Sequence, residues 1–486
     1  MNNIDTQFYE TGLQLIDSVS PEIAQEIKRE LVSQRARLKM IASENYCSGA
    51  VRACASSIVM DKYAEGYVDL EKPQGHRYYS GCENVDKIEQ LGMKWACELF
   101  GSEYAYLQPH SGSNANLIAY WSIISAKVMN PKVDAICEFL NRAGLKDIPD
   151  DLWEDIRHTC GDQDLLAMSL DCGGHLTHGD RTNISSQLFR CHSYGVDPST
   201  GLVDYEEVRR KALEIRPLIL LAGFSAYPRN LNFKKFREIA DECGAVLMVD
   251  FSHPMGLLAG KVLKGEYNPV PYADIITSTS HKTMRGPRSA FILSKNWLRP
   301  YLEKGCPLVQ GGELPNMVAA KAICFKEAMS PEFQEYAHQV VKNSKALASK
   351  LVSDGIKVIT GGTDNHIILT DVSPLGLTGR QAEQVLEECG IVANRNALPD
   401  DLNGAWYTSG IRLGTPALTT CGMKENEMEL IGGFISKILK NAKPAMTKKG
   451  IPSKAKVYID ESIKEEILDK VASLLKRYPP YKEILQ

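Results

Sequence analysis

Short apolar runs recur along much of the chain, and segments of helix length separate them. The runs are YAYLQP, DLLAMSL, PLILLAG, AVLMVD and ADIITS, which begin at residues 104, 164, 217, 245 and 273. Runs of this length are typical of buried strands, and their alternation with helical segments is typical of a parallel sheet covered by helices. The sequence therefore predicts an α/β domain with a largely parallel sheet.

The other parts of the chain have different patterns. Residues 1–40 contain amphipathic helical patterns such as IAQEIKRELVSQRARL, which predict a helical arm. We expect a large α/β domain over residues 41–325 and a smaller α+β domain over residues 326–486. In the latter, HIILTDV predicts a strand between two helices, YAHQVVKNSKALASKLV and RQAEQVLEE. The basic stretch KNAKPAMTKKGIPSKAK is expected to be a loop before a last helix that ends near Arg477.

Composition excludes several classes of function. The net charge of −4 argues against nucleic acid as the main partner, because phosphate binding usually leaves a basic footprint. No apolar run approaches the length of a membrane span, and MNNIDTQFYETGL lacks the pattern of a secretory signal. The 13 cysteines are scattered along the chain, which favours reduced thiols. These features predict a cytoplasmic protein with no membrane partner.

Two polar residues follow neighbouring strands of the predicted sheet. Lys282 lies in ADIITSTSHKTMRGPRSAFIL, between two apolar runs, and Asp250 comes directly after AVLMV. A lysine at the buried end of a strand is costly unless its amine is neutral, paired or covalently modified. Chemistry in open α/β sheets collects at the carboxyl ends of the strands. Asp250 has a simpler interpretation as a helix cap, and Lys282 has one as a solvated loop lysine.

A third feature has the pattern of a phosphate-binding loop. In QPHSGSNAN, Ser111, Gly112 and Ser113 follow a strand and precede the helical segment NLIAYWSII. They would offer backbone N–H groups and hydroxyls to an anion at the helix N-terminus, although such turns also cap ordinary helices. A lysine nucleophile, a strand-end carboxylate and a phosphate cradle together describe a pyridoxal 5'-phosphate site.

Several blocks of sequence carry a specific resemblance. They are KYAEGY, RYYSGCE, QPHSGSNAN, GGHLTHG, SAYPR, VDFSHPMGL, HKTMRGPR and SGIRLGTPA, in the order found in serine hydroxymethyltransferases. The chain resembles this family, whose fold is the aspartate-aminotransferase type (fold type I) of pyridoxal phosphate enzyme. The resemblance implies an enzyme of one-carbon metabolism and amino-acid biosynthesis that interconverts serine and glycine and passes the one-carbon unit to tetrahydrofolate. The alternatives are a related aldolase or amino-acid racemase on the same scaffold, and a catalytically silent binding protein.

The resemblance also implies site residues, which we transfer position by position. Lys282 resembles the Schiff-base lysine, Asp250 the partner of the pyridine nitrogen, and His175 the histidine that stacks on the cofactor ring. Glu65 is the expected proton-transfer group, and Thr279 lies beside the lysine. The remaining expected cofactor contacts are Ser111, Gly112, Ser113, Ser225, His253, Tyr63, Gly311 and Gly312.

Substrate contacts follow in the same way. Arg412 resembles the arginine that grips the substrate carboxylate, with help from Ser43, Glu65, Tyr78 and Tyr79. Tyr63 and Glu65 match residues that reach into a neighbouring subunit's site, which implies a homodimer. The expected folate contacts are Leu170, Gly174, His175, Leu176 and Asn396.

Three features depart from the resemblance or compete with it. An insertion over about residues 125–165 predicts an added helical hairpin. Gly404, Ala405 and Trp406 replace a proline-containing turn against the folate. Cys172, His175 and His178 have a spacing that mimics a metal site. No fourth ligand is apparent, so we predict no metal.

Overall fold

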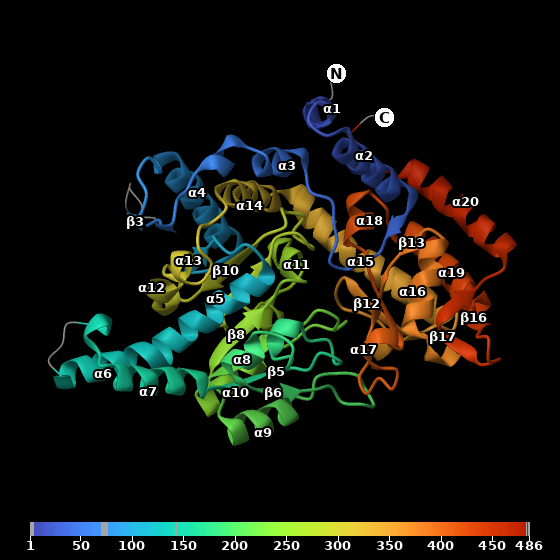
Figure 1. Cartoon of the computed structure of the whole chain (residues 1–486). Helices are drawn as coiled ribbons and strands as arrows, with labels where there is room; N and C mark the ends of the chain where they lie inside the picture. The colour runs from blue at the N-terminus through green and yellow to red at the C-terminus, as the bar shows by residue number, and fades with distance from the viewer. Residues whose placement is uncertain (1–3, 70–75, 141–143, 483, 485–486) are drawn as a thin grey trace. The chain divides into compact units, whose positions relative to one another are not determined.

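The computed structural model describes residues 4–69, 76–140, 144–482 and 484. The chain forms two compact units, shown in Figure 1. The terminal unit comprises Met1–Gly49 and His338–Gln486, and the central unit comprises Ala50–Ala337. The borders expected from the sequence lie near residues 40 and 325, with the first 40 residues as a separate arm, whereas in the structure this segment shares a unit with the C-terminal part.

The central unit is built on a seven-stranded sheet, which confirms the predicted α/β class with a mainly parallel sheet. Its strand order is β4-β10-β9-β8-β7-β5-β6. β10 runs antiparallel to both of its neighbours, and the remaining pairs are parallel. The strands are β4 (Tyr104–Tyr106), β5 (Asp164–Met168), β6 (Arg190–Tyr194), β7 (Ile219–Gly223), β8 (Val246–Asp250), β9 (Ile275–Thr279) and β10 (Ala290–Ser294).

The register brings the ends of the middle strands to one edge of the sheet. Asp250 pairs with Gly223 on β7 and with Thr277 on β9, and Thr279 pairs with Ala290 on β10. Every residue of β7, β8, β9 and β10 is buried. This explains why these strands read as continuous apolar runs without alternation, since helices cover both faces of the sheet.

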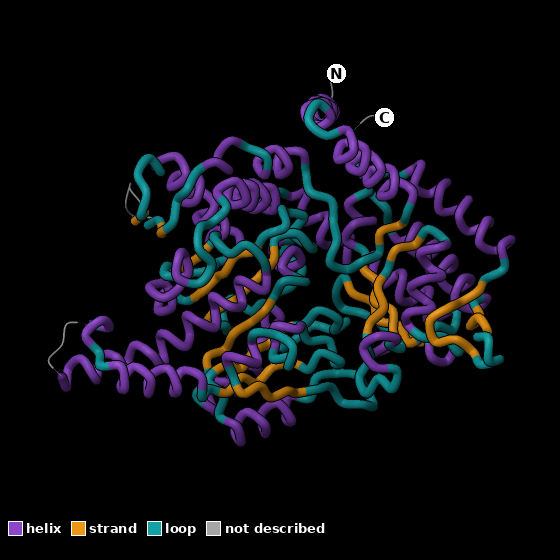
Figure 2. The backbone as a smooth tube through the Cα atoms, viewed as in Figure 1, coloured by secondary structure: helices purple, strands orange, loops and turns teal. Residues whose placement is uncertain are grey.

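Helices surround this sheet, and Figure 2 shows them against the strands. The helices of the central unit are α3 (Gly49–Ala55), α4 (Glu83–Phe100), α5 (Gly112–Ile124), α6 (Asn130–Leu140), α7 (Asp150–Gly161), α8 (Ser185–Leu188), α9 (Tyr205–Ile215), α10 (Phe233–Cys243), α11 (Met255–Ala259), α12 (Arg299–Leu302), α13 (Gly305–Leu308) and α14 (Pro315–Ala328). Short 3₁₀ turns are η1 (Ile58–Asp61), η3 (Leu145–Asp147), η4 (Leu176–His178), η5 (Gly265–Tyr267) and η6 (Asn296–Leu298). A small antiparallel pair, β2 (Gly66–Tyr67) and β3 (His76–Arg77), precedes α4.

Helices α6 and α7 lie in the segment for which the sequence predicts an added helical hairpin. α5 passes through a π-helical turn, η2 (Ser125–Met129), directly into α6, and α7 lies beside it (Figure 1). Val133, Ile148 and Ile156 form a small apolar core of their own in this hairpin. Residues 141–143 lie outside the described residues.

The terminal unit contains a second sheet, in the antiparallel order β11-β12-β15-β14. Its strands are β11 (Lys357–Val358), β12 (Ile367–Asp371), β14 (Asn394–Asn396) and β15 (Gly410–Gly414), while β1 (Leu38–Lys39) pairs in parallel with β13 (Ile391–Val392). The helices are α1 (Ile4–Asp17), α2 (Pro21–Ala36), α15 (Pro331–Ser353, which begins in the central unit), α16 (Gly379–Glu388), α17 (Gly404–Tyr407), α18 (Pro416–Thr420), α19 (Glu425–Asn441) and α20 (Glu461–Arg477), with 3₁₀ turns η7 (Ile359–Gly361) and η8 (Ser373–Leu375).

The prediction of a loop before the last helix is wrong. This segment forms a hairpin of β16 (Lys443–Met446) and β17 (Pro452–Tyr458), and α20 then ends at Arg477 as predicted. Gln381 Nε2 donates to the carbonyl groups of Ser453 and Lys456, at 2.6 Å and 2.9 Å. Side chains of α16 therefore hold a strand that has too few apolar residues to be recognised from its own sequence.

Two features bear on the kind of environment the chain suits. Among the residues described, none of the helices combines the length and apolar character needed to cross a bilayer. All thirteen cysteines lie in the described part of the chain, and each is a free thiol.

Candidate active site

Lys282 lies in the connection between β9 and β10, just beyond the carboxyl end of β9. Its Nζ atom donates a hydrogen bond to Thr279 Oγ1 at 2.9 Å. Thr279 in turn donates to Ser252: its backbone N lies 3.2 Å from Ser252 Oγ, and its Oγ1 lies 3.3 Å from the Ser252 carbonyl oxygen. Ser252 follows β8, so these contacts join the ends of two neighbouring strands.

Asp250 is buried at the end of β8, and all four of its contacts are hydrogen bonds. Oδ1 accepts from the backbone N of Ser252 at 3.1 Å and from Ser252 Oγ at 2.6 Å. Oδ2 accepts from Asn116 Nδ2 at 2.9 Å and lies 3.1 Å from His178 Nε2. The bond from the Ser252 backbone is a local turn contact, and Asp250 does not cap the following helix, because the N-cap residue of α11 is Pro254.

These contacts determine the charge of Asp250. Burial alone would raise the pKa of this carboxyl group, because the interior disfavours an ion. The hydrogen bond and charge of His178 act in the opposite direction, as do the charge of His175 and the hydrogen bond from Ser252. The pKa of Asp250 therefore lies well below its usual range, and the carboxylate is ionised at neutral pH.

The predicted phosphate loop begins α5. Ser111 is the N-cap residue, and its Oγ accepts from the backbone N of Asn114 at 3.2 Å. Gly112 lies so close to β9 that a Cβ atom there would be 2.8 Å from Thr279 Cγ2. A glycine is thus needed for the loop to approach the strand that leads to Lys282. The first turn of α5, which includes Ser113, thus lies against the end of β9.

His175 is connected to Asp250 through two residues that the sequence analysis did not single out. Its Nδ1 lies 2.8 Å from Thr177 Oγ1, and Thr177 Oγ1 accepts from Asn116 Nδ2 at 2.8 Å. Asn116 Nδ2 is also the group that donates to Asp250. Asn116 lies on the first turns of α5, four residues after Gly112, and this helical spacing was the available signal.

Two further predicted residues lie on neighbouring connections. The backbone N of Ser225, after β7, donates to the Gly173 carbonyl at 2.7 Å, which holds it beside the segment that contains Gly174 and His175. His253, after β8, is buried, and its carbonyl accepts from Thr283 Oγ1 at 2.6 Å. Thr283 is the residue after Lys282, so His253 lies at the base of the Lys282 connection.

The residues expected to serve a neighbouring subunit form a separate cluster. The rings of Tyr63 and Tyr79 lie 4.6 Å apart, and both side chains are exposed, as is Tyr78. The Glu65 carboxylate raises the pKa of Tyr63 by its charge. A Cβ atom on Gly312 would lie 3.6 Å from Tyr63 Cε1 and 3.8 Å from Glu65 Cγ.

This cluster lies close to the predicted phosphate loop. His110 Nε2, just before Ser111, lies 2.8 Å from the Gly312 carbonyl oxygen. Gln310 Nε2 donates to the Gln108 carbonyl at 2.9 Å. Residues 310–312, which include Gly311, thus lie beside the chain that leads into α5.

A buried ion-pair network holds the same region, and the sequence analysis did not identify it. Arg77 Nε lies 2.8 Å from Asp86 Oδ1, and Arg77 Nη2 lies 2.6 Å from Glu89 Oε2. Arg77 also donates to the carbonyl groups of Ala64 and Gly66, at 2.7 Å and 3.1 Å. Ala64 and Gly66 flank Glu65, so the network fixes the backbone on either side of Glu65.

The predicted residues of the terminal unit have their own surroundings. Arg412 lies on β15 opposite Asn394, and its Nε donates to Asn394 Oδ1 at 3.3 Å. Burial lowers the pKa of Arg412 to about 10. Gly414, two residues along β15, packs against Ala42, which precedes Ser43. Ser43 therefore lies on the segment that passes the end of β15.

The altered turn before Arg412 forms α17. Trp406 is 61% exposed, and two guanidinium groups lie near its ring. The Cζ atom of Arg380 is 4.9 Å from the ring centroid, and that of Arg395 is 5.4 Å from it. Asn396 follows Arg395 on β14, and its Nδ2 donates to the Ala397 carbonyl at 2.6 Å.

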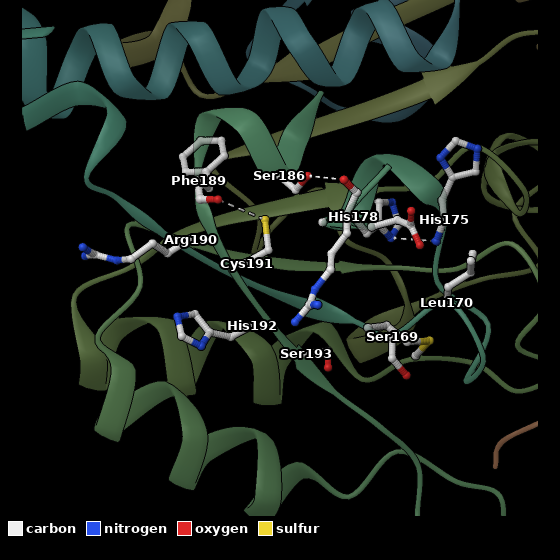
Figure 3. A pocket seen from close by; sticks show the side chains of 14 residues that line it. Ser169, Leu170, His175, His178, Ser186, Phe189, Arg190, Cys191, His192 and Ser193 are labelled. Carbon is white, nitrogen blue, oxygen red and sulfur yellow. Dashed lines mark hydrogen bonds between the residues drawn. The ribbon is translucent and has the colours of Figure 1, made fainter. Parts of the chain in front are cut away.

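A cavity of about 590 Å³ adjoins the His175 segment. Figure 3 shows His175 and Leu170 on one side of it and Arg190 and His192 on the other. Arg181 also lines it. Leu170 and Leu176, both predicted folate contacts, are exposed at 43% and 46%.

The histidine cluster differs from the metal site considered in the sequence analysis. Among the described residues, His175, His178 and Asp250 have ligand atoms within 4.8 Å of one another, and Cys172 is not part of this group. His178 Nε2 contacts Asp250, and its Nδ1 accepts from the backbone N of His175 at 3.2 Å. Both ring nitrogens of His178 thus already have hydrogen-bond partners.

Comparisons with known proteins identify the family of the chain. A family model described as "Serine hydroxymethyltransferase" matches residues 16–132 and 159–435, which leaves out most of the α6–α7 hairpin. The chain is 48% identical to the serine hydroxymethyltransferase of Treponema pallidum over 98% of this chain and 81% of that protein. It is 48% identical to that of Mycolicibacterium smegmatis over 97% of this chain and 94% of that protein, and 47% identical to that of Salinispora tropica over 99% of both. The chain therefore belongs to the serine hydroxymethyltransferase family.

Proposed function

We propose that the protein is a pyridoxal phosphate-dependent serine hydroxymethyltransferase that interconverts serine and glycine and transfers the one-carbon unit to tetrahydrofolate. One observation carries this proposal. In a chain that matches the family over nearly its whole length, hydrogen bonds connect Lys282 through Thr279 and Ser252 to Asp250, beside the N-terminus of α5.

The donor set suits pyridoxal phosphate. The Lys282 amine would bind the cofactor aldehyde, the ionised Asp250 carboxylate would hold the proton on the ring nitrogen, and the N-terminus of α5 would bind the phosphate. Gly112 supports the last role, since any Cβ there would meet Thr279. When bound, the cofactor accepts the electron pair left on the substrate α-carbon as a bond to that carbon breaks.

The protein's own groups perform the remaining steps. The Arg412 guanidinium would bind the substrate carboxylate with a planar fork that suits two oxygen atoms, and Ser43 would assist it. Glu65 would move a proton at the oxygen of the serine hydroxyl group. His175, held through Thr177 and Asn116, would cover one face of the cofactor ring.

Tetrahydrofolate is the second substrate in this proposal. Leu170 and Leu176 present exposed apolar side chains next to His175, and they would contact the apolar part of the folate. The backbone of Gly174 is a further proposed contact; a glycine is needed at this position because a Cβ atom would meet the Met168 carbonyl oxygen. Asn396 is the proposed contact in the terminal unit.

We also propose a homodimer and a cytoplasmic location. Tyr63, Tyr78 and Tyr79 are exposed aromatic side chains beside Glu65, and a partner subunit would cover them. Thirteen free thiols suit a reducing compartment. The three relatives named above are all serine hydroxymethyltransferases, so the aldolase or racemase alternative has no support.

The test begins with the purified full-length protein. It should absorb visible light, and borohydride reduction should fix pyridoxal phosphate on one peptide, the one that contains Lys282. Serine and tetrahydrofolate together should give glycine much faster than serine alone. Lys282→Ala should abolish the covalent attachment, whereas Lys264→Ala, which changes an exposed lysine of the same unit, should leave it intact. Attachment to a different lysine would refute the site, and glycine formation that ignores saturating tetrahydrofolate would refute the transferase activity.

A further inference from the structure

Lys321 is a buried lysine for which the proposed reaction has no role. It lies on α14, and only 1% of its surface is exposed. Burial lowers its pKa to about 7, while the nearby Glu89 carboxylate acts in the opposite direction. Burying an amine is costly unless hydrogen bonds compensate it, so its surroundings are informative.

The amine of Lys321 contacts four acceptors on two segments of the chain. The first two are the carbonyl oxygens of Leu107 and Pro109, the latter at 3.3 Å. The other two are Ser289 Oγ and the Ala290 carbonyl oxygen, both at 2.8 Å. An ammonium group has three hydrogens to donate, so these acceptors use its full capacity.

The two segments are the supports of the active site. Residues 107–109 lead from β4 into the phosphate loop, and Ser289 and Ala290 end the connection that carries Lys282. The segments also bond to each other directly. Ser289 Oγ donates to the Pro109 carbonyl at 3.1 Å, and the backbone N of Ala290 donates to it at 3.3 Å.

We propose that Lys321 is a positioning residue for the cofactor phosphate, which ties the phosphate loop to the Lys282 connection. This inference rests on the proposed function, because it presupposes that the loop binds the phosphate of pyridoxal phosphate. Lys321 touches neither the cofactor nor the substrate and acts through the backbone of Leu107 and Pro109. Without it, the bonds from Ser289 and Ala290 to the Pro109 carbonyl remain, but the start of α5 is held less firmly relative to the Lys282 connection.

The phosphate-specific part of cofactor binding separates this role from a general structural one. The full-length protein, freed of its cofactor, is titrated with pyridoxal 5'-phosphate and separately with pyridoxal, which has the aldehyde but no phosphate. In Lys321→Met the affinity for pyridoxal phosphate should fall about tenfold or more, whereas that for pyridoxal should change less than about threefold; loss of a single hydrogen bond to a charged group accounts for a tenfold change.

Two further variants sharpen the test. Lys326→Met changes an exposed lysine of the same helix and should leave both affinities as in the wild type. Ser289→Ala removes one acceptor of the amine and leaves the core otherwise filled. It should lower the affinity for pyridoxal phosphate alone by about threefold, and its effect should not add fully to that of Lys321→Met.

Each outcome has a definite meaning. An equal loss for both ligands in Lys321→Met, or no loss, would overturn the positioning role. If Lys321→Met does not fold, Ser289→Ala decides alone, and an unchanged preference for pyridoxal phosphate over pyridoxal in that variant would overturn it. A wild-type protein that binds pyridoxal phosphate but fails to convert serine would refute the proposed function and leave this inference standing.

Discussion

The variant Arg77→Met should be much less stable than the wild type, although Arg77 lies on β3, in the small strand pair β2–β3. The guanidinium group is only 3% exposed, and its two carboxylate partners, Asp86 and Glu89, are 6% and 2% exposed. It also holds the carbonyl groups of Ala64 and Gly66. Methionine has a similar length but supplies none of the five hydrogens of the guanidinium group.

The expected loss follows from the burial of all three charges. Removing one partner of a buried ion pair costs about 3–5 kcal/mol, because the other charge stays behind without compensation. Here two carboxylates stay behind, so the upper part of that range applies. For a domain of this kind the change lowers the thermal midpoint by on the order of 10 °C.

The assay is urea denaturation at pH 7, followed by circular dichroism and by tryptophan fluorescence. The transitions seen by the two probes need not coincide, since the chain has two units. The variants are therefore compared by the urea midpoint of the transition that Arg77→Met shifts. Arg209→Met is the matched control. Arg209 pairs with Glu242 at 2.7 Å, but both side chains are over 40% exposed, and exposed pairs contribute at most about 1 kcal/mol.

A midpoint for Arg77→Met no lower than that of Arg209→Met would refute this account of the network. The variant Arg77→Met/Glu89→Met gives a second check. Replacing Glu89 as well removes one of the two stranded charges and leaves that of Asp86, so the double variant should be more stable than Arg77→Met. A double variant that is less stable by the sum of both single changes would mean that the two residues act independently.

Three further outcomes are expected. Arg412→Lys should raise the KM for serine about tenfold or more with a smaller change in kcat, because a single ammonium group cannot bind both carboxylate oxygens; an unchanged KM would remove Arg412 from the site. Asp250→Asn should keep the fold but lower kcat about 10³-fold, since the Coulomb energy of an opposite charge near 4 Å is about 4 kcal/mol at an effective dielectric constant of 20. Burial, reinforced by Lys282 and Arg288, lowers the pKa of His281 to about 3. The unfolded chain therefore takes up a proton below about pH 6.5 that the folded chain excludes, so the free energy of unfolding should fall by about 1.4 kcal/mol per pH unit between about pH 6 and pH 4, and His281→Asn should flatten this slope in urea titrations.

The central sheet was predictable because its strands are buried on both faces. The runs AVLMVD and ADIITS become β8 and β9 almost residue for residue. β6 is different: its sequence, RCHSY, is polar and mostly not buried, and it forms the edge of the sheet, where it pairs with one neighbouring strand. The hairpin β16–β17 escaped prediction for a related reason, since side chains of α16 stabilise it.

The candidate site likewise contains residues that could be predicted from the sequence and residues that could not. Lys282, Asp250 and Gly112 were identifiable because each follows a recognisable strand, and strand ends meet at one edge. Asn116 lies within a quoted motif, yet nothing in its own neighbourhood reveals that its amide reaches Asp250, 134 residues away. Such contacts depend on the packing of α5 against the sheet, which the pattern of apolar residues does not specify at the level of single atoms.

The continuous helix from Gly112 to Leu140 shows how this chain has room to grow without disturbing its chemistry. One end of the helix begins at the phosphate loop, and the other carries the α6–α7 hairpin, with a π-helical turn between them. At 1.5 Å per residue the two ends lie about 40 Å apart. A π-helical turn is the trace expected of a residue added within a helix, because it absorbs the extra length locally. The α6 end of the helix is therefore a place where natural variation, or an engineer grafting a peptide, can lengthen or trim the molecule while the end at Gly112 keeps its register.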